Sequence, residues 1–267
     1  MRFRQWGGEV KKYLVINGSP RGESSKTLQV AKEFAFNLDC SEVEIINVSE
    51  KTINPCKGCH KCLYEKKEYC HQWDSTTDDD MKVLRRKYFE SDTVIFSTPV
   101  YFFSIPGILK NFIDRLFSCS EPFMIKCKQR ESVSSHPLRK SNLKNIFLIA
   151  SCGFPEYEHF KPLIETFKWY AMVSNVNFLG YIACPASHLL SMDIFKDEKK
   201  NFLSLVRSMG KKIVETKAIT ENDNERLKLL YFAKRIGKFR RLANEYSLKK
   251  LNERDLGTNI NIKSKLK

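Results

Sequence analysis

Residues 95–115, IFSTPVYFFSIPGILKNFIDR, contain the pattern that decides the fold. A short apolar run reaches Phe96, and Pro99 ends it, because proline has no N–H to donate to a sheet ladder. Aromatic residues follow in a loop, and Pro106 then opens a segment whose apolar residues recur at helical spacing. A strand, a shaped loop and an amphipathic helix in this order are typical of a ligand site at the edge of an open α/β sheet. An ordinary buried strand and helix is the alternative for this segment alone.

A second strand, loop and helix lie near the N-terminus. Residues 12–17 (KYLVIN) are rich in β-forming side chains, and the loop GSPRGESSKT at 18–27 leads into a helix. Unpaired N–H groups and the helix dipole favour an anion at such a helix start, and Arg21 adds a bidentate phosphate donor. The loop lacks the dinucleotide-binding glycine fingerprint and the Gly-Lys-Thr ending of a nucleotide-hydrolase loop. We expect a phosphate group here; a plain turn with a serine cap is the alternative.

With these motifs the chain resembles the flavodoxin-like NADPH-dependent FMN reductases and their relatives, the iron–sulfur flavoproteins. The resemblance covers roughly residues 12–215 and rests on GSPRGESSKT at 18–27, PCKGCHKC at 55–62, DDDM at 78–81, TPVYFFSIPGILKNFIDR at 98–115 and SCGFPE at 151–156. It implies that the first loop holds the FMN phosphate and that two later loops flank the isoalloxazine ring. The residues expected to bind FMN are Ser19, Arg21, Ser25, Lys26, Thr27, Pro99, Val100, Tyr101, Phe102, Ser104, Cys152 and Gly153. Lys26 stands where relatives often carry asparagine, so it either adds charge to the phosphate or points to solvent.

Strands and helices alternate along most of the chain. We expect strands near 12–17, 42–47, 93–98, 144–150 and 177–182, and helices near 24–37, 79–90, 106–118, 157–174 and 196–216. Alternation predicts a parallel sheet with helices on both faces and right-handed crossovers. The expected fold class is α/β, a flavodoxin-like doubly wound five-stranded parallel sheet of order 2-1-3-4-5 with a C-terminal helical extension. Residues 119–143 break the rhythm, and they form either one wall of the substrate opening or a neutral surface loop.

Four cysteines form a further motif, Cys56-x2-Cys59-x2-Cys62-x7-Cys70. Thiols at three-residue steps in an irregular loop can converge, and a fourth from a nearby turn completes the ligand set of an iron–sulfur cluster. The spacing resembles that of the iron–sulfur flavoproteins, which implies a 4Fe-4S cluster, yet FMN reductase relatives carry a similar loop with unliganded thiols. Zinc, with His60 or His71 as a substitute ligand, is the third alternative, although structural zinc sites usually pair two CxxC units across a longer spacer.

Composition sets limits on class and location. The 267 residues are 42% hydrophobic, which is enough for a sizeable core, and carry a formal net charge of +15. No apolar run approaches the roughly 20 residues of a membrane span, and the N-terminus lacks the apolar core of a signal peptide. Nine cysteines, an odd number with four in one loop, favour a reducing compartment over a disulfide framework. We therefore expect a cytoplasmic protein without a transmembrane segment.

Residues 222–267 differ from the rest, with 13 Lys and Arg against 5 Asp and Glu. Apolar side chains recur there at steps of three and four, so we expect a helix over residues 222–256 that docks on the domain or on a second subunit. A basic helix on a membrane surface or on nucleic acid is the alternative, and no nucleic-acid-binding motif supports the latter. The expected domains are a flavodoxin-like FMN-binding domain at 1–220 and a basic helical extension at 221–267.

An FMN-dependent oxidoreductase is the function that the resemblance implies, with electrons passing from NAD(P)H through flavin to a quinone, a flavin or a protein acceptor. Because the cofactor supplies the chemistry, no side chain is assigned as acid, base or nucleophile. The alternative is an electron carrier in which FMN and a cluster exchange single electrons with a ferredoxin-like partner. The basic charge would favour an acidic redox protein as partner. The resemblance also implies a homo-oligomer.

Overall fold

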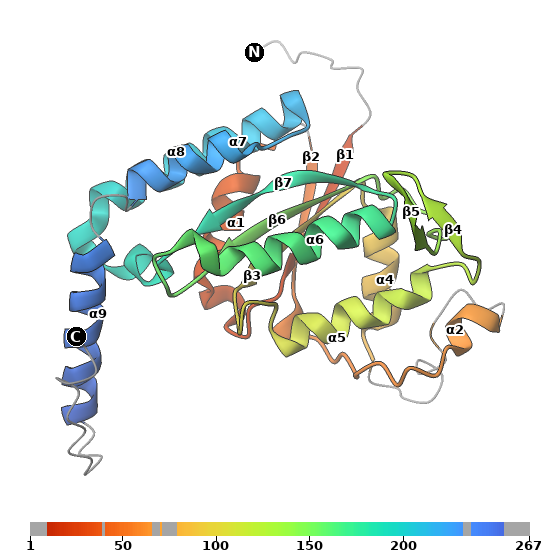
Figure 1. Cartoon of the computed structure of the whole chain (residues 1–267), viewed down its shortest axis with the longest axis horizontal. Helices are drawn as coiled ribbons and strands as arrows, with labels where there is room; N and C mark the ends of the chain where they lie inside the picture. Colours follow the sequence, from red (N-terminus) through yellow and green to blue (C-terminus); the bar gives the residue numbers. More distant parts are fainter. Residues whose placement is uncertain (1–9, 39–40, 66–69, 71–78, 232–235, 254–267) are drawn as a thin grey trace, which may run out of the picture. The chain divides into compact units, whose positions relative to one another are not determined.

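The computed structural model describes residues 10–38, 41–65, 70, 79–231 and 236–253. Its centre is a five-stranded parallel sheet in the order β2-β1-β3-β6-β7 (Figure 1). The strands are β1 (Lys11–Asn17), β2 (Ser41–Asn47), β3 (Thr93–Pro99), β6 (Asn145–Ser151) and β7 (Asn177–Cys184). Two further strands form a separate small sheet. When they are left out and the five strands are renumbered in chain order, the order becomes 2-1-3-4-5, so the predicted fold class is confirmed. All five predicted strands are present, each shifted by two residues or fewer at either end.

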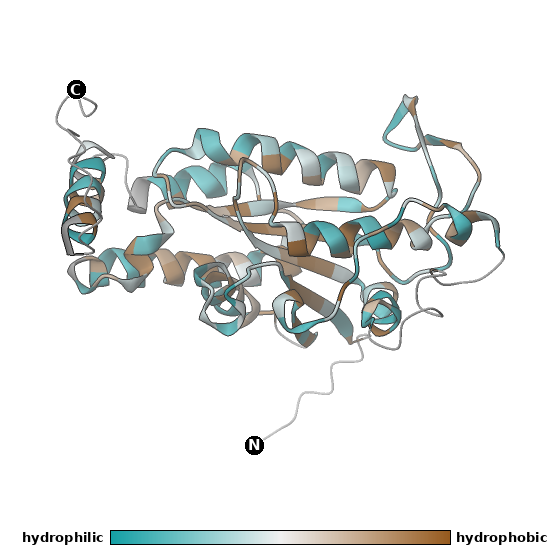
Figure 2. Cartoon of the chain, turned by 90° about the horizontal axis from the view of Figure 1, so that it is seen from below, coloured by the Kyte–Doolittle hydropathy of each residue, from teal (hydrophilic) through white to brown (hydrophobic). Residues whose placement is uncertain are grey.

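Helices cover both faces of the sheet. The first group is α1 (Lys26–Ala35) and α7 (Lys196–Thr216), and the second is α4 (Met81–Glu90), α5 (Gly107–Arg115) and α6 (Lys161–Val173). On the first face Phe34 of α1 stacks on Phe147 of β6 at 4.8 Å between ring centroids. On the second face Phe96 of β3 lies 5.0 Å from Phe167 of α6. The central strands are therefore buried on both faces, and Figure 2 shows them as a brown layer between helices.

The insert at 119–143, for which the sequence predicted no strand, contains a second, two-stranded antiparallel sheet. Its strands are β4 (Ile125–Cys127) and β5 (Arg130–Ser135). The turn between them carries no glycine, and it is fixed instead by distant partners. Lys128 N donates to Asn175 Oδ1 at 3.1 Å, and Gln129 Nε2 donates to Val176 O at 3.2 Å. The hairpin therefore depends on the end of α6 rather than on a local turn signal.

The C-terminal part departs from the single predicted helix over 222–256. Two helices are described, α8 (Glu221–Tyr231) and α9 (Ile236–Glu253), and residues 232–235 lie outside the described residues. The chain forms two compact units, 1–231 and 232–267, so α8 belongs to the first unit. Taken by itself, α9 exposes most of its side chains, Tyr246 among them. Among the helices described, none has the length and apolar content that crossing a bilayer requires.

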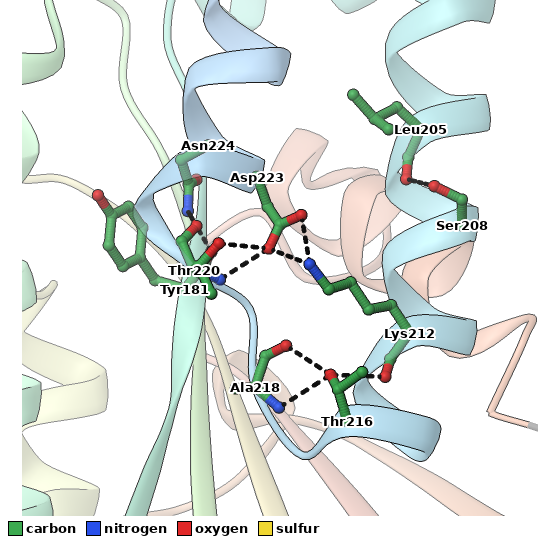
Figure 3. A network of polar contacts seen from close by, with 9 residues as sticks. All are labelled: Tyr181, Leu205, Ser208, Lys212, Thr216, Ala218, Thr220, Asp223 and Asn224. Atoms are coloured by element: carbon green, nitrogen blue, oxygen red, sulfur yellow. Dashed lines mark hydrogen bonds and ion pairs between the residues drawn. The ribbon is translucent and has the colours of Figure 1, made fainter.

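A buried polar network fixes α8 to α7 and β7 (Figure 3). Lys212 Nζ donates to both carboxylate oxygens of Asp223 at 2.7 Å, and Thr220 N and Oγ1 each donate to Asp223 Oδ2 at 2.8 Å. Asn224 Nδ2 donates to Tyr181 O at 2.9 Å. Asp223 and Asn224 are both buried. The start of α8 is therefore part of the folded α/β unit.

Candidate cofactor site

The first predicted loop, of which residues 18–25 precede α1, follows β1. The side chain of one asparagine fixes it through hydrogen bonds. Asn17 Nδ2 donates to Gly22 O at 3.0 Å and to Asn47 Oδ1 at 2.8 Å, while Asn17 Oδ1 accepts from Ser19 N at 3.3 Å. Gly22 has a φ of +50°, a conformation that a side chain would strain. The loop is thus a turn that these hydrogen bonds fix at the carboxyl end of β1.

The N-terminus of α1 supplies unpaired donors next to this turn. Ser25 Oγ accepts from Leu28 N at 3.3 Å and caps the helix. The backbone N–H groups of Lys26 and Thr27 have no acceptor in the part of the chain that the structure describes. Thr27 is buried, and its hydroxyl is hydrogen-bonded to Ser151 of the third loop. Two free N–H groups at a helix start favour a bound anion.

His188, which follows β7, lies near Arg21 of the first loop and near Gly153 of the third loop. Arg21 is exposed, and its backbone N donates to Ser19 Oγ at 3.2 Å. Loss of hydration, and then the nearby charge of Arg21, lower the pKa of His188. A Cβ built on Gly153 would stand 3.1 Å from His188 Nε2. His188 lies outside the family motifs, and the only sequence signal for it was a histidine shortly after the fifth strand.

The second loop makes a tight turn with unusual backbone angles. Tyr101 and Ser104 exchange both backbone hydrogen bonds at 2.9 Å, and the residues between them, Phe102 and Phe103, have φ of +46° and +62°. Left-handed backbone costs a residue with a side chain roughly 1–2 kcal/mol. All four side chains are exposed, Phe102 completely. Such strain is typical of functional loops, and here it presents aromatic surface at the sheet edge.

The third loop, which follows β6, is tied to the second loop and to β7. Val100 N donates to Ser151 O at 2.7 Å, and Cys152 N donates to Cys184 O at 3.0 Å. Phe154 N donates to Cys152 Sγ at 3.4 Å. Burial raises the pKa of the Cys152 thiol, so the thiol stays protonated at neutral pH.

An aromatic stack that the sequence did not predict joins the second and third loops. The ring of His159 lies between Phe103, at 5.7 Å, and Phe154, at 4.5 Å, with all three rings nearly parallel. Both phenylalanines are exposed. The stack therefore places aromatic side chains of both loops next to each other.

The three predicted FMN loops are therefore neighbours, because they follow β1, β3 and β6, which are adjacent in the sheet. Gly18 N donates to Ser97 O at 2.8 Å, and a Cβ on Gly18 would lie only 2.4 Å from Leu109 Cδ2, so the first loop packs directly on α5. Pro99 ends β3 and is half-buried, as are Val100 and Lys26. The elements bring together the whole predicted set at one edge: Ser19, Arg21, Ser25, Lys26, Thr27, Pro99, Val100, Tyr101, Phe102, Ser104, Cys152 and Gly153.

The predicted cysteine ligands follow β2, and Cys62 lies in the short helix α2 (Lys61–Tyr64) rather than in an irregular loop. Cys56 and Cys59 are exposed, Cys62 is half-buried and Cys70 is buried. Burial raises the pKa of Cys62, and charge on Cys70, Cys59 and Cys56 raises it further, so the four thiols share one region. Four such thiols are the donor set of an iron–sulfur cluster. Over the described ranges, however, no group of three or more His, Cys, Asp or Glu side chains is arranged to hold a metal ion.

The neighbourhood of these cysteines differs from the predictions in two respects. The alternative zinc ligand His71 lies outside the described residues, and His60 makes an edge contact with Phe117 at 5.8 Å. Asp78 to Asp80 of the DDDM motif were expected to cap the following helix, and Asp78 lies outside the described residues. Asp79 Oδ1 accepts from Met81 N at 2.9 Å, but Asp80 makes no side-chain cap bond and instead accepts from Thr52 N at 2.8 Å.

Residues 11–134 match the model of the NADPH-dependent FMN reductase family. Over these residues, a little under half of its length, the chain is similar to this family. An iron–sulfur flavoprotein of Archaeoglobus fulgidus is 39% identical over 124 residues, which cover 46% of this chain and 53% of that protein. An FMN-dependent NADH:quinone oxidoreductase of Pseudoalteromonas atlantica is 28% identical over 120 residues, covering 43% and 58% respectively. The chain thus matches about half the length of these curated relatives.

Solved structures share the fold. An FMN-dependent NADH-azoreductase from Bacillus anthracis in complex with FMN superposes with a TM-score of 0.56 and 16% identity, covering 77% of this chain and all of that one. An NAD(P)H:quinone oxidoreductase from Methanothermobacter marburgensis has a TM-score of 0.51, 12% identity and similar coverage, 77% and 100%. At these identities the comparison shows the fold alone, and it confirms the predicted flavodoxin-like fold.

Proposed function

We propose that the protein is an FMN-dependent oxidoreductase that takes electrons from NAD(P)H and passes them to a quinone, a flavin or a protein acceptor. The observation that carries this proposal is the convergence of three loops at one sheet edge, where the start of α1 has two unpaired N–H groups. The family match over residues 11–134 and relatives named as FMN-dependent oxidoreductases support it.

The first loop would bind the phosphate. The N–H groups of Lys26 and Thr27 and the hydroxyls of Ser19 and Ser25 would donate to it, and Arg21 would add a charge-assisted bond. The loop has no dinucleotide fingerprint, which favours FMN over FAD. The half-buried position of Lys26 is compatible with a charge directed at the phosphate.

The second and third loops would hold the ring. Tyr101, Phe102 and Ser104 present aromatic surface and polar groups on one side, and the backbone of Cys152 and Gly153 stands on the other. When bound, FMN supplies the hydride and electron chemistry, while the chain supplies binding, orientation and the electrostatic surroundings of the ring. Positive charge from Arg21 at this edge would also favour anionic nicotinamide nucleotides.

The test is an anaerobic absorption spectrum followed by turnover. We expect one FMN per chain and oxidation of NADH or NADPH with a quinone or free flavin as acceptor. Protein that binds no FMN at micromolar concentration would exclude the proposal. Protein that binds FMN but oxidises neither nucleotide would instead leave the second candidate.

The second candidate is an electron carrier that combines FMN with a 4Fe-4S cluster and exchanges electrons with an acidic, ferredoxin-like protein. The spacing of Cys56, Cys59, Cys62 and Cys70 and the influence of the other three thiols on Cys62 favour it, as does the relative named iron–sulfur flavoprotein. The net charge of +15 would speed encounter with an acidic partner. Broad cluster absorption that is bleached by reduction, together with no nicotinamide turnover, would distinguish this carrier from the reductase. A cytoplasmic location and a homo-oligomer belong to both proposals.

A further inference from the structure

A cavity of about 580 Å³ lies apart from the three FMN loops. It is bounded by the cysteine loop, the end of α5, the insert with β5, and the end of α6, through residues that include Cys56, Ile113, Phe117, Ser134, Leu138 and Val173. The insert at 119–143 therefore lines this cavity, and its predicted role as a wall of the substrate opening stays a prediction. Its volume lies within the range of small-molecule sites, roughly 300–1,000 Å³.

The helix α5 separates this cavity from the FMN loops. Gly107 begins α5 directly after the second loop, whereas the cavity is lined by Ile113 and residues beyond it. Six residues of helix correspond to about 9 Å at 1.5 Å per residue, and Leu116 to Ser120 extend farther. A molecule in the cavity is therefore on the opposite end of α5 from a flavin bound at the sheet edge.

The walls combine aliphatic and aromatic surface. Ile113, Leu138 and Val173 provide aliphatic contacts. The ring of Phe117 has an imidazole edge-on at each side, with His60 at 5.8 Å and His136 at 5.9 Å between centroids and interplanar angles of 83° and 89°. Such a surface favours a flat aromatic ring, which could stack in offset or edge geometry.

Two tyrosine hydroxyls provide a polar group in this apolar surface. The hydroxyls of Tyr88 and Tyr170 share one hydrogen bond of 2.6 Å, and both side chains line the cavity. Only one of the two protons is used by that bond, and no second partner for either hydroxyl is found in the described ranges. Burial raises the pKa of both tyrosines well above 10, so they remain donors. One proton is therefore available to a ligand that accepts, such as a carbonyl oxygen.

The charges argue against an anionic ligand. No lysine or arginine is found among the described residues that line the cavity. The one carboxylate, Asp114, is paired with Lys110. Burial raises the pKa of Cys119 to about 12, so this thiol is neutral as well. The charges of Arg85 and Arg139 reach Cys119, but neither arginine is among the described residues that line the cavity. A phosphate or carboxylate would therefore lose its hydration without direct contact with either cation.

We propose that this cavity binds a neutral, flat aromatic compound with a carbonyl group, of the quinone class, with its ring on Phe117 and its carbonyl oxygen accepting from the Tyr88 and Tyr170 pair. This proposal does not rest on the proposed function, because binding requires neither FMN nor electron transfer. It concerns a binding site only, and no reaction is assigned to it.

The experiment is calorimetric titration of the full-length protein, as purified and without nicotinamide, with 2,3-dimethyl-1,4-naphthoquinone, which has no free ring position for thiol addition. We expect saturable binding that Val173→Trp weakens about tenfold or more by filling the cavity. If Val173→Trp lowers the stability of the protein, Ser134→Trp replaces it. Ser134 is exposed, and a tryptophan there also fills the cavity. Phe103→Ala, at the FMN edge, is the matched control and should leave the affinity unchanged.

A second comparison isolates the hydroxyl pair. The double variant Tyr88→Phe/Tyr170→Phe keeps both rings and removes both protons, so it should weaken the quinone by roughly 3- to 10-fold. It should leave the affinity for 2,3-dimethylnaphthalene, which has no carbonyl, unchanged. Absence of quinone binding, or binding that responds to Phe103→Ala and not to the tryptophan variants, would overturn the proposal.

Discussion

Arg115, the last residue of α5, forms a fully buried ion pair with Asp79, with Nη1 2.7 Å from Oδ2. The same Nη1 donates to Asn54 O at 2.8 Å, and Asn54 Nδ2 donates to Asp79 Oδ2 at 3.3 Å. Asn54 precedes the cysteine loop and Asp79 follows it. One side chain therefore fastens both ends of that loop to the helix that begins at the second FMN loop.

Arg115→Met should lower the free energy of unfolding by about 3–5 kcal/mol, because it leaves the charge of Asp79 buried without a partner. Lys110→Met is the matched control, since Lys110 pairs with Asp114 at the surface of the same helix and such pairs contribute about 1 kcal/mol or less. Urea unfolding measures both. Adding Asp79→Asn to Arg115→Met should recover part of the lost free energy of unfolding. Equal losses for Arg115→Met and Lys110→Met would contradict the buried ion pair.

Arg21→Ala should weaken FMN binding by about 1.5–3 kcal/mol, which corresponds to roughly 10- to 150-fold, because it removes a charge-assisted bond to the phosphate. Lys168→Ala removes an exposed positive charge on α6 and should have little effect. Quenching of flavin fluorescence on titration gives both dissociation constants. Unchanged affinity in the Arg21 variant would remove this side chain from the site.

The cysteine loop allows a direct test of the cluster. Single serine variants of Cys56, Cys59, Cys62 and Cys70 should each reduce iron and sulfide in anaerobically purified protein, because a 4Fe-4S cluster needs four protein ligands. Cys184→Ala, in β7, should retain both. If the unaltered protein contains almost no iron or sulfide while FMN binds normally, the cluster is excluded and unliganded thiols remain.

The sequence predicted those elements whose cause is local. The strands around Ile95 and Phe147 are apolar on both faces, as strands between two helix layers must be, and Ser25 marks the start of α1 by its own cap bond. The FMN loops could be predicted because each follows such a strand and because their motifs resemble a family. Order in the sheet then placed the loops side by side.

Features that depend on distant partners could not be predicted. The β4–β5 hairpin is held by Asn175, about fifty residues later, rather than by a turn sequence. The ring of His159 meets Phe103 only because β3 and β6 are adjacent. Nothing in the sequence distinguished Arg115 from the exposed arginines, since its burial follows from contact with Asn54 and Asp79.

The network of Figure 3 predicts a pH dependence of stability. Burial opposes ionisation of Asp223, but bonds from Lys212 and Thr220 outweigh it and hold the pKa of this carboxyl below its ordinary 3.8. A depressed pKa means that the contribution is fully present above 3.8 and is lost as the pH falls through the lower folded value. Asp223→Asn should therefore cost about 1–3 kcal/mol at pH 7 and progressively less below about pH 4.

Thermal unfolding between pH 2.5 and 7 tests this dependence. Glu165→Gln, which alters an exposed pair with Lys168, provides the control and should follow the wild type at every pH. A difference between wild type and Asp223→Asn that stays constant down to pH 2.5 would show that the carboxylate does not carry the effect.

Two truncations separate the roles of α8 and α9. Ending the chain after Thr220 removes the buried side chains of Asp223, Asn224 and Leu227, so it should lower the melting temperature by several degrees. Ending it after Tyr231 keeps them and removes only the second unit. If α9 docks on a second subunit or on the α/β unit, this longer form should have a smaller mass by light scattering or a lower melting temperature, because apolar burial outweighs weak surface charge contacts. Unchanged mass and melting, with loss of salt-sensitive binding to DNA or anionic vesicles, would instead assign α9 to electrostatic tethering.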